Sequence, residues 1–251
     1  MPAENPYQKQ NERAAIWATL YFFVWLLQRL WCHLGLPEHC ELSEKPLEVL
    51  TDLVVLFGFS LVQAWWCELL ETSRFEDTIK MPWLFAVIFI TPLLVSALGR
   101  IKGLQAWDQE HEGEDFRFSS VRTTFFIFGL IAAVFMVSWH FARAWIILPG
   151  MELISGPPPP EHKPHEGDEN LLQTYAVSRF VIVTWSILFV AFILVEDDGF
   201  NYRGALLAWV LSLLAVFPHP VSNLWLGVTT GIFLQGIGSN RLQFLGCTEH
   251  A

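Results

Sequence analysis

The chain has 251 residues, of which 53% are hydrophobic and only 16% are charged, and this composition is far too apolar for a soluble domain of that length. Its formal net charge of -10, from 25 acidic and 15 basic residues, offers no basic stripe for a nucleic-acid backbone, so nucleic acid is excluded as a partner. The composition indicates an integral membrane protein embedded in a lipid bilayer.

Apolar stretches of near-spanning length recur along the chain and predict about seven transmembrane helices. They cover residues 14–35, 48–70, 83–99, 121–149, 176–196, 204–218 and 221–237. The last two have about 15 to 17 residues, short of the roughly 20 that cross a hydrocarbon core, and Pro218-His219-Pro220 separates them. They either span at a tilt or in a thinned bilayer, or they form a re-entrant hairpin that leaves fewer true spans.

These elements predict an all-α, polytopic membrane helix bundle. A single helical domain at residues 14–237 follows a polar N-terminal segment, 1–13, and precedes a polar C-terminal tail, 238–251. The first apolar run is interpreted as a retained helix, because it is too long for a signal peptide and no A-x-A site follows it. Five basic residues in loops on the N-terminal side against seven on the other side favour a cytoplasmic C-terminus.

The chain has four cysteines, but their pattern predicts neither a metal site nor a disulfide framework. There is no C-x-x-C pair, and no histidine lies at zinc-ligand spacing from a cysteine. Cys32, at the end of the first predicted helix, has no evident partner. The chain also lacks H-E-x-x-H, G-x-S-x-G and a phosphate-binding glycine loop, so we expect no metal and no cofactor.

One carboxylate lies inside an otherwise apolar helix prediction. Glu68 falls near the end of the run 48–70, and Cys67 separates it from the indoles of Trp65 and Trp66. Residues three positions apart share a helix face, so Trp65 and Glu68 are predicted to point the same way. An ionisable group at this depth is costly in lipid and normally faces the bundle interior or a wet cavity.

Alternating helix directions bring further polar residues to the membrane face that holds Glu68. His140 and Arg143 lie near the end of the fourth predicted span, Tyr175 and Arg179 at the start of the fifth, and His219 in the Pro-His-Pro break. We therefore predict a pocket between helix ends. Burial favours the protonated form of Glu68, able to donate a proton, unless Arg143 or Arg179 pairs with it; the sequence leaves both alternatives open.

A structural interpretation of these residues stands beside the functional one. Long side chains near helix ends reach the membrane interface, and Glu68 with His140 can form ordinary interhelical contacts. Most tryptophans of a membrane protein form an interfacial belt, although Trp65, Trp66 and Trp139 lie beside the ionisable residues and can line an aromatic cavity that stabilises a cation.

The compact chain, its seven or so short helices, its many tryptophans and the Trp66-Cys67-Glu68 sequence near the end of the second helix resemble the small membrane-bound terpene cyclases of fungal meroterpenoid and indole-diterpene pathways. In that family the tryptophan tends to precede the glutamate directly, whereas Cys67 intervenes here. The resemblance implies an isomerase or lyase of secondary metabolism that protonates an epoxide or alkene of a prenylated lipophilic substrate, without metal, in the endoplasmic reticulum or another endomembrane.

The resemblance also implies roles for individual residues. Glu68 is the expected general acid, tuned by His140 and Arg143, and the substrate-binding residues are Trp65, Trp66, Trp139, Tyr175 and Arg179. The alternative is a non-catalytic membrane subunit of a larger complex, with unknown protein partners, or a small transporter or channel. A closed aromatic pocket around Glu68 would favour the enzyme, and a filled core would favour the structural alternative.

Overall fold

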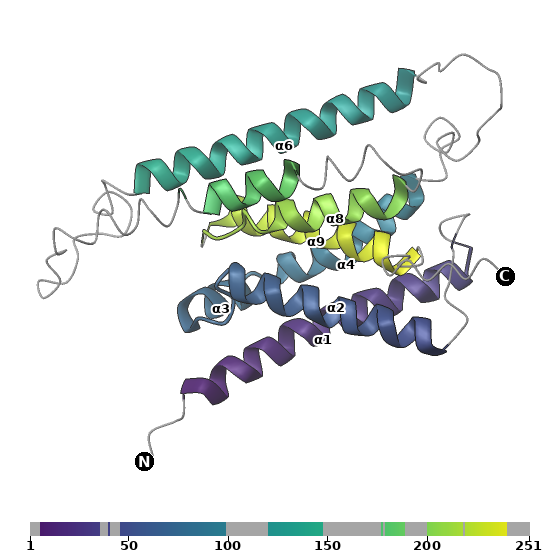
Figure 1. Ribbon diagram of the computed structural model, residues 1–251, viewed down its shortest axis with the longest axis horizontal. Coiled ribbons are helices and arrows are strands. Elements are labelled where there is room, and N and C mark those ends of the chain that lie inside the picture. Colours follow the sequence, from purple (N-terminus) through teal and green to yellow (C-terminus); the bar gives the residue numbers. More distant parts are fainter. Residues whose placement is uncertain are drawn as a thin grey trace, which may run out of the picture.

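The computed structural model describes residues 6–35, 40, 46–98, 120–147, 177, 179–188, 200–217 and 219–239. All regular structure within these ranges is helical, which confirms the predicted all-α class. Figure 1 shows α1 (Pro6–His33), α2 (Pro46–Trp66), α3 (Thr72–Ile79), α4 (Pro82–Leu98), α6 (Ser120–Ile147), a helical segment at Arg179–Leu188, α8 (Phe200–Ser212) and α9 (Pro220–Ser239).

The helices overlap the predicted apolar runs but differ from them at several ends. Helix α1 begins at Pro6, inside the predicted polar N-terminal segment 1–13, and α8 covers Phe200–Ser212 instead of 204–218. A short helix, α3, occupies a stretch for which no helix was predicted, and α2 ends at Trp66 rather than at residue 70. Four helices, α1, α2, α4 and α9, begin at a proline. Proline suits the first helical position, because the N–H that it lacks has no partner inside the helix there and its φ angle already matches.

Successive long helices run in opposite directions and lie side by side in a bundle (Figure 1). The bundle has two ends, called the site end and the disulfide end. The site end is where α2, α6 and α8 finish and where α3, α4 and α9 begin. The disulfide end is where α1, α4 and α9 finish and α2 begins.

Helix α9 is the centre of the bundle, packed against α4, α8 and α1. Fourteen of its 20 residues are buried, so it contacts neighbours on nearly every side. Glycines permit this close approach. A Cβ atom at Gly231 would lie 2.6 Å from the Thr91 Cβ of α4, and one at Gly238 would lie 2.6 Å from the Gln28 Cγ of α1. Small residues at such crossings let helix backbones pack closely without a hydrophobic driving force.

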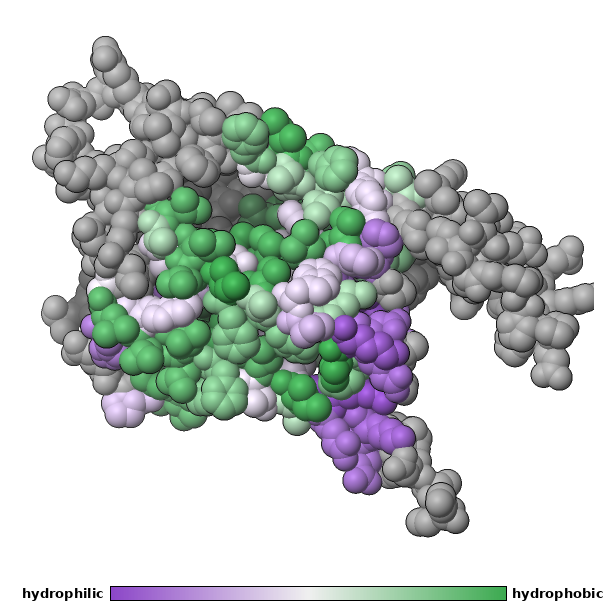
Figure 2. Space-filling model, turned by 180° about the vertical axis from the view of Figure 1, so that it is seen from behind, coloured by the Kyte–Doolittle hydropathy of each residue, from purple (hydrophilic) through white to green (hydrophobic). Residues whose placement is uncertain are grey.

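The outer faces of the helices are apolar, whereas buried polar side chains lie inside. Phe23, Val54 and Phe135 are more than half exposed, but Gln28 and Gln63 are completely buried. Figure 2 shows apolar colour over most of one face and hydrophilic colour gathered at the site end, where the first exposed residues of α1 lie. Two described helices, Gln8–His33 and Val49–Trp66, are long and apolar enough to cross a membrane.

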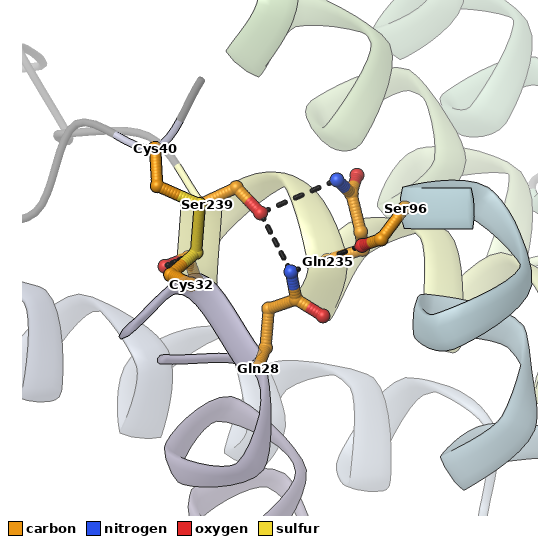
Figure 3. The surroundings of a disulfide bond; sticks show 7 residues. Gln28, Cys32, Cys40, Ser96, Gln235 and Ser239 are labelled. Atoms are coloured by element: carbon orange, nitrogen blue, oxygen red, sulfur yellow. Dashed lines mark hydrogen bonds between the residues drawn. A yellow bond between two sulfur atoms is a disulfide. The ribbon is translucent and has the colours of Figure 1, made fainter. Parts of the chain in front are cut away.

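The cysteine prediction is wrong, because Cys32 and Cys40 form a disulfide (Figure 3). Helix α1 ends just after Cys32, and Gly35 has a positive φ of 78°, a left-handed conformation that glycine adopts without strain. The Cα atoms of the two cysteines are 5.7 Å apart. Chain reversal at Gly35 creates this proximity, which the spacing of eight residues does not reveal.

Candidate functional site

Glu68 lies in the turn that ends α2. The N–H of Glu68 donates to the Trp65 carbonyl and the N–H of Leu69 donates to the Ala64 carbonyl, at 3.2 and 2.9 Å. These two bonds form a Schellman motif in which Glu68 takes the position that follows the C-cap. Leu69 and Ala64 are both buried, which supplies the apolar contact that accompanies this motif.

The backbone of Glu68 is in the left-handed region, with φ 59°. Among the described residues, Glu68 is the one residue other than glycine that has a positive φ. Glycine normally takes this position, and a side chain there costs roughly 1–2 kcal/mol. The local backbone preference thus disfavours glutamate at this position, and we expect contacts of the Glu68 side chain to offset the strain.

The end of α2 also corrects the predicted arrangement of Trp65 and Glu68. Because the helix stops at Trp66, the two residues do not share a helix face. Trp65 is 66% exposed on the outside of the bundle, which does not fit the predicted role in lining a pocket. Of these two neighbouring indoles, Trp66 is the one that contacts an ionisable residue, Arg179.

The carboxylate of Glu68 forms an ion pair with Arg179. Arg179 Nη2 donates to Glu68 Oε1 at 2.8 Å, with the side chains 17% and 31% exposed. The Arg179 guanidinium also lies over the Trp66 ring, 5.6 Å from its centroid, in a cation–π contact. The sequence left open whether Glu68 is an unpaired acid or is paired with an arginine, and in the structure it is paired with Arg179.

His140 is buried on α6 and bonded on both ring nitrogens. Its Nδ1 lies 2.8 Å from the Met136 carbonyl, and its Nε2 lies 3.1 Å from Ser222 Oγ on α9. A carbonyl only accepts, so Nδ1 carries the hydrogen, and in the neutral ring Nε2 accepts from the serine hydroxyl. The ring stacks on Phe217, with the centroids 6.0 Å apart, so His140 ties α6 to the connection between α8 and α9.

Arg74, on α3, is a further ionisable residue at the site end and was not among the predicted site residues. It is 4% exposed and donates to the carbonyls of Ala215 and Phe217, at 3.2 and 2.5 Å. These carbonyls follow the end of α8, where a cation is favourable. Burial lowers the pKa of the Arg74 guanidinium from its ordinary value, yet an arginine stays protonated in a protein.

Arg74 bonds to the connection between α8 and α9, and the His140 ring packs against Phe217 of that same connection. Glu68 and Arg179 form a second group of contacts at the site end. The sequence signal for Arg74 was its place within Thr72–Ile79, a short helix with an apolar face that is easily mistaken for a charged loop.

The structure places the remaining predicted residues as follows. Trp139 lies beside His219, with the ring centroids 5.0 Å apart, and forms an edge contact with His140. The helix ends that carry Glu68, His140, Arg179 and His219 meet at the site end, as the alternating topology predicts. Tyr175 and the side chain of Arg143 lie outside the described residues.

A buried hydrogen-bond network one turn deeper than Trp66 was not predicted. Gln63 accepts from Trp17 Nε1 at 3.2 Å and from the Tyr21 hydroxyl. Its amide nitrogen donates to Thr230 Oγ1 at 3.0 Å and to Ser212 Oγ. One glutamine thus connects α1, α2, α8 and α9, and satisfied polar groups of this kind hold apolar helices in register.

In the described part of the chain, no three histidine, cysteine, aspartate or glutamate side chains lie together as a set that could hold a metal ion. No protein-family model, curated protein or solved structure matches the chain.

Proposed function

We propose that the chain is a multi-pass integral membrane protein and that its site end is a non-catalytic network that holds helix ends together, as in a subunit of a membrane complex. In this proposal about seven spans cross the bilayer. They are α1, α2, α4, α6, the apolar run 176–196 that contains the described segment Arg179–Leu188, the run 204–218 that overlaps α8, and α9. The observation that carries the proposal is the pairing of the polar groups at the site end with one another and with backbone carbonyls.

The distribution of side chains supports a lipid environment. The outward faces of α1, α2, α4 and α6 carry large exposed hydrophobic side chains, which in water would be an aggregation hazard. Several buried polar groups bond to partners on other helices, as Gln63 does, and the largely buried pair Arg29–Asp52 joins α1 to α2. Paired interior polar groups under an apolar exterior are typical of helix bundles in bilayers.

The contacts of the ionisable residues support a structural role. Glu68 holds Arg179, Arg74 holds the carbonyls after α8, and His140 holds Ser222 on α9. A general acid has to reach its substrate, whereas Glu68 Oε1 already accepts a hydrogen bond from Arg179 at 2.8 Å. Each of these side chains already performs a bonding task that the fold requires.

One observation favours a second candidate, the metal-independent terpene cyclase implied by the family resemblance. The strained backbone of Glu68 lies beside the indole of Trp66, and strain of this kind tends to accumulate at functional sites. In that reading, the ion pair with Arg179 opens when an epoxide or alkene of a prenylated substrate enters, and the protonated Glu68 then acts as the acid.

The test compares wild-type protein with Glu68→Gln in microsomes given a panel of prenylated and epoxidised prenyl substrates. Glu76→Gln is the matched control, because Glu76 is an exposed glutamate on α3. We expect no turnover by the wild type and a lower thermal stability of Glu68→Gln alone. Turnover by the wild type and by Glu76→Gln that disappears in a folded Glu68→Gln protein would establish the cyclase and overturn the structural proposal.

A further inference from the structure

We infer that the disulfide end of the bundle faces an oxidising compartment, the lumen of the endoplasmic reticulum or the cell exterior, and that the site end faces the cytosol. This orientation rests on the proposed multi-pass membrane location. If the orientation holds, any ligand or partner of Glu68, Arg74 and His140 has to reach them from the cytosol.

The disulfide and the site lie at opposite ends of the same helix. Cys40 precedes the first residue of α2, and Glu68 follows its last residue by two positions. With 21 residues at about 1.5 Å each, α2 is roughly 30 Å long, the thickness of a bilayer hydrocarbon core. The two features are therefore on opposite sides of any membrane that α2 crosses.

The disulfide is built into the packing of its end of the bundle. Cys32 is buried, and its sulfur lies 4.0 Å from the Gly238 carbonyl of α9. One turn earlier on α1, Gln28 donates to Ser96 of α4 at 3.1 Å and to Ser239 of α9 at 2.8 Å (Figure 3). The bonded cysteines thus belong to the junction of three helix ends.

Redox chemistry decides which side this end faces. Disulfides form and persist in oxidising compartments, whereas glutathione and thioredoxin keep cytosolic thiols reduced. A structural disulfide at one end of a membrane bundle accordingly assigns that end to the lumen or the exterior. The opposite end, with the first residues of α1, α3 and Arg179, is then cytosolic.

This orientation reverses the one favoured by the loop charges, in which five basic residues faced seven. The charge rule is a statistical bias that acts during insertion, and a margin of two is small. Among the described residues, Lys9, Arg13, Arg74 and Lys80 lie at the site end, whereas Arg122 and Arg203 lie near the starts of α6 and α8 at the disulfide end. The disulfide is therefore the deciding observation.

The experiment measures labelling by a membrane-impermeant maleimide in sealed microsomes, whose outer surface is cytosolic. Cys32→Ser leaves a thiol at Cys40, and the double variant Cys32→Ser/Cys40→Ser gives the background from Cys67 and Cys247. Glu76→Cys in the double variant reports the site end. We expect the Cys40 thiol to be unlabelled in sealed vesicles and labelled after permeabilisation. Glu76→Cys should be labelled in both conditions.

Labelling of the Cys40 thiol in sealed vesicles, or of Glu76→Cys only after permeabilisation, would overturn the orientation. Denatured wild-type protein is alkylated in parallel with and without reductant, and the double variant gives the baseline count from Cys67 and Cys247. Two thiols above that baseline that appear only after reduction support the disulfide, and two above it that are free without reductant contradict it. Extraction with alkaline carbonate tests the membrane location separately. Release of the chain would refute the proposed function, whereas a retained chain with the opposite labelling pattern refutes the orientation alone.

Discussion

The two ends of the bundle are held together by different chemistry. The site end uses charged side chains, in which Arg179 pairs with Glu68 and Arg74 donates to carbonyls beyond α8. The disulfide end uses the covalent Cys32–Cys40 bond and the neutral hydrogen bonds of Gln28. A reducing cytosol does not disturb the first kind of contact, and an oxidising compartment maintains the second.

The largest expected effect comes from removing Arg74. Arg74→Ala leaves the Ala215 and Phe217 carbonyls without their charged donor, and hydrogen bonds to a charged group contribute about 1.5–3 kcal/mol each. We expect the free energy of unfolding to fall by roughly 3 kcal/mol, measured by thermal or denaturant unfolding in detergent micelles. Lys80→Ala, at the exposed end of the same short helix, should change it by less than about 0.5 kcal/mol. Equal effects of the two substitutions would show that Arg74 does not hold the site end.

Breaking the covalent link tests the other end. The double variant Cys32→Ser/Cys40→Ser opens a loop of eight residues, and loop-closure entropy predicts a loss of about 2.5 kcal/mol. Reductant should lower the melting temperature of the wild type toward that of the double variant and leave the double variant unchanged. A wild-type melting temperature that does not respond to reductant would contradict a stabilising disulfide.

The conformation of Glu68 allows its backbone and side-chain contributions to be separated. Glu68→Ala and Glu68→Gly both remove the pair with Arg179, but glycine adopts a φ of 59° without strain. We expect Glu68→Gly to be more stable than Glu68→Ala by about 1 kcal/mol in unfolding measurements. Alanine as stable as glycine would mean that the turn after α2 carries no strain.

The smallest expected effect distinguishes the two neighbouring tryptophans. Trp66→Leu removes the ring under Arg179, a contact of about 0.5–1 kcal/mol at a partly exposed site, and should lower the melting temperature. Trp65→Leu changes a side chain on the outside of the bundle and should stay within about 0.5 kcal/mol of the wild type. A larger effect at Trp65 than at Trp66 would place the functional indole on the outer face.

Local sequence features were enough to predict most of the helices and their order. Long apolar runs with prolines at their starts, such as Pro82 and Pro220, position helices without reference to the rest of the chain. Alternating helix directions then place Glu68, His140 and Arg179 at one end, which follows from the order of elements alone. The sequence by itself thus determined the all-α class and which helix ends meet.

Tertiary structure decided the individual contacts. Whether Trp65 or Trp66 faces Arg179 depends on where α2 stops, and the turn after Trp66 differs from a continued helix by two hydrogen bonds. The pairing of Cys32 with Cys40 depends on the chain reversal at Gly35, and the role of Arg74 depends on the carbonyls of a segment more than a hundred residues away. Helix formation is local, so periodicity and composition reveal it. Partner choice depends on distances between segments remote in sequence, and those distances exist only in the folded chain.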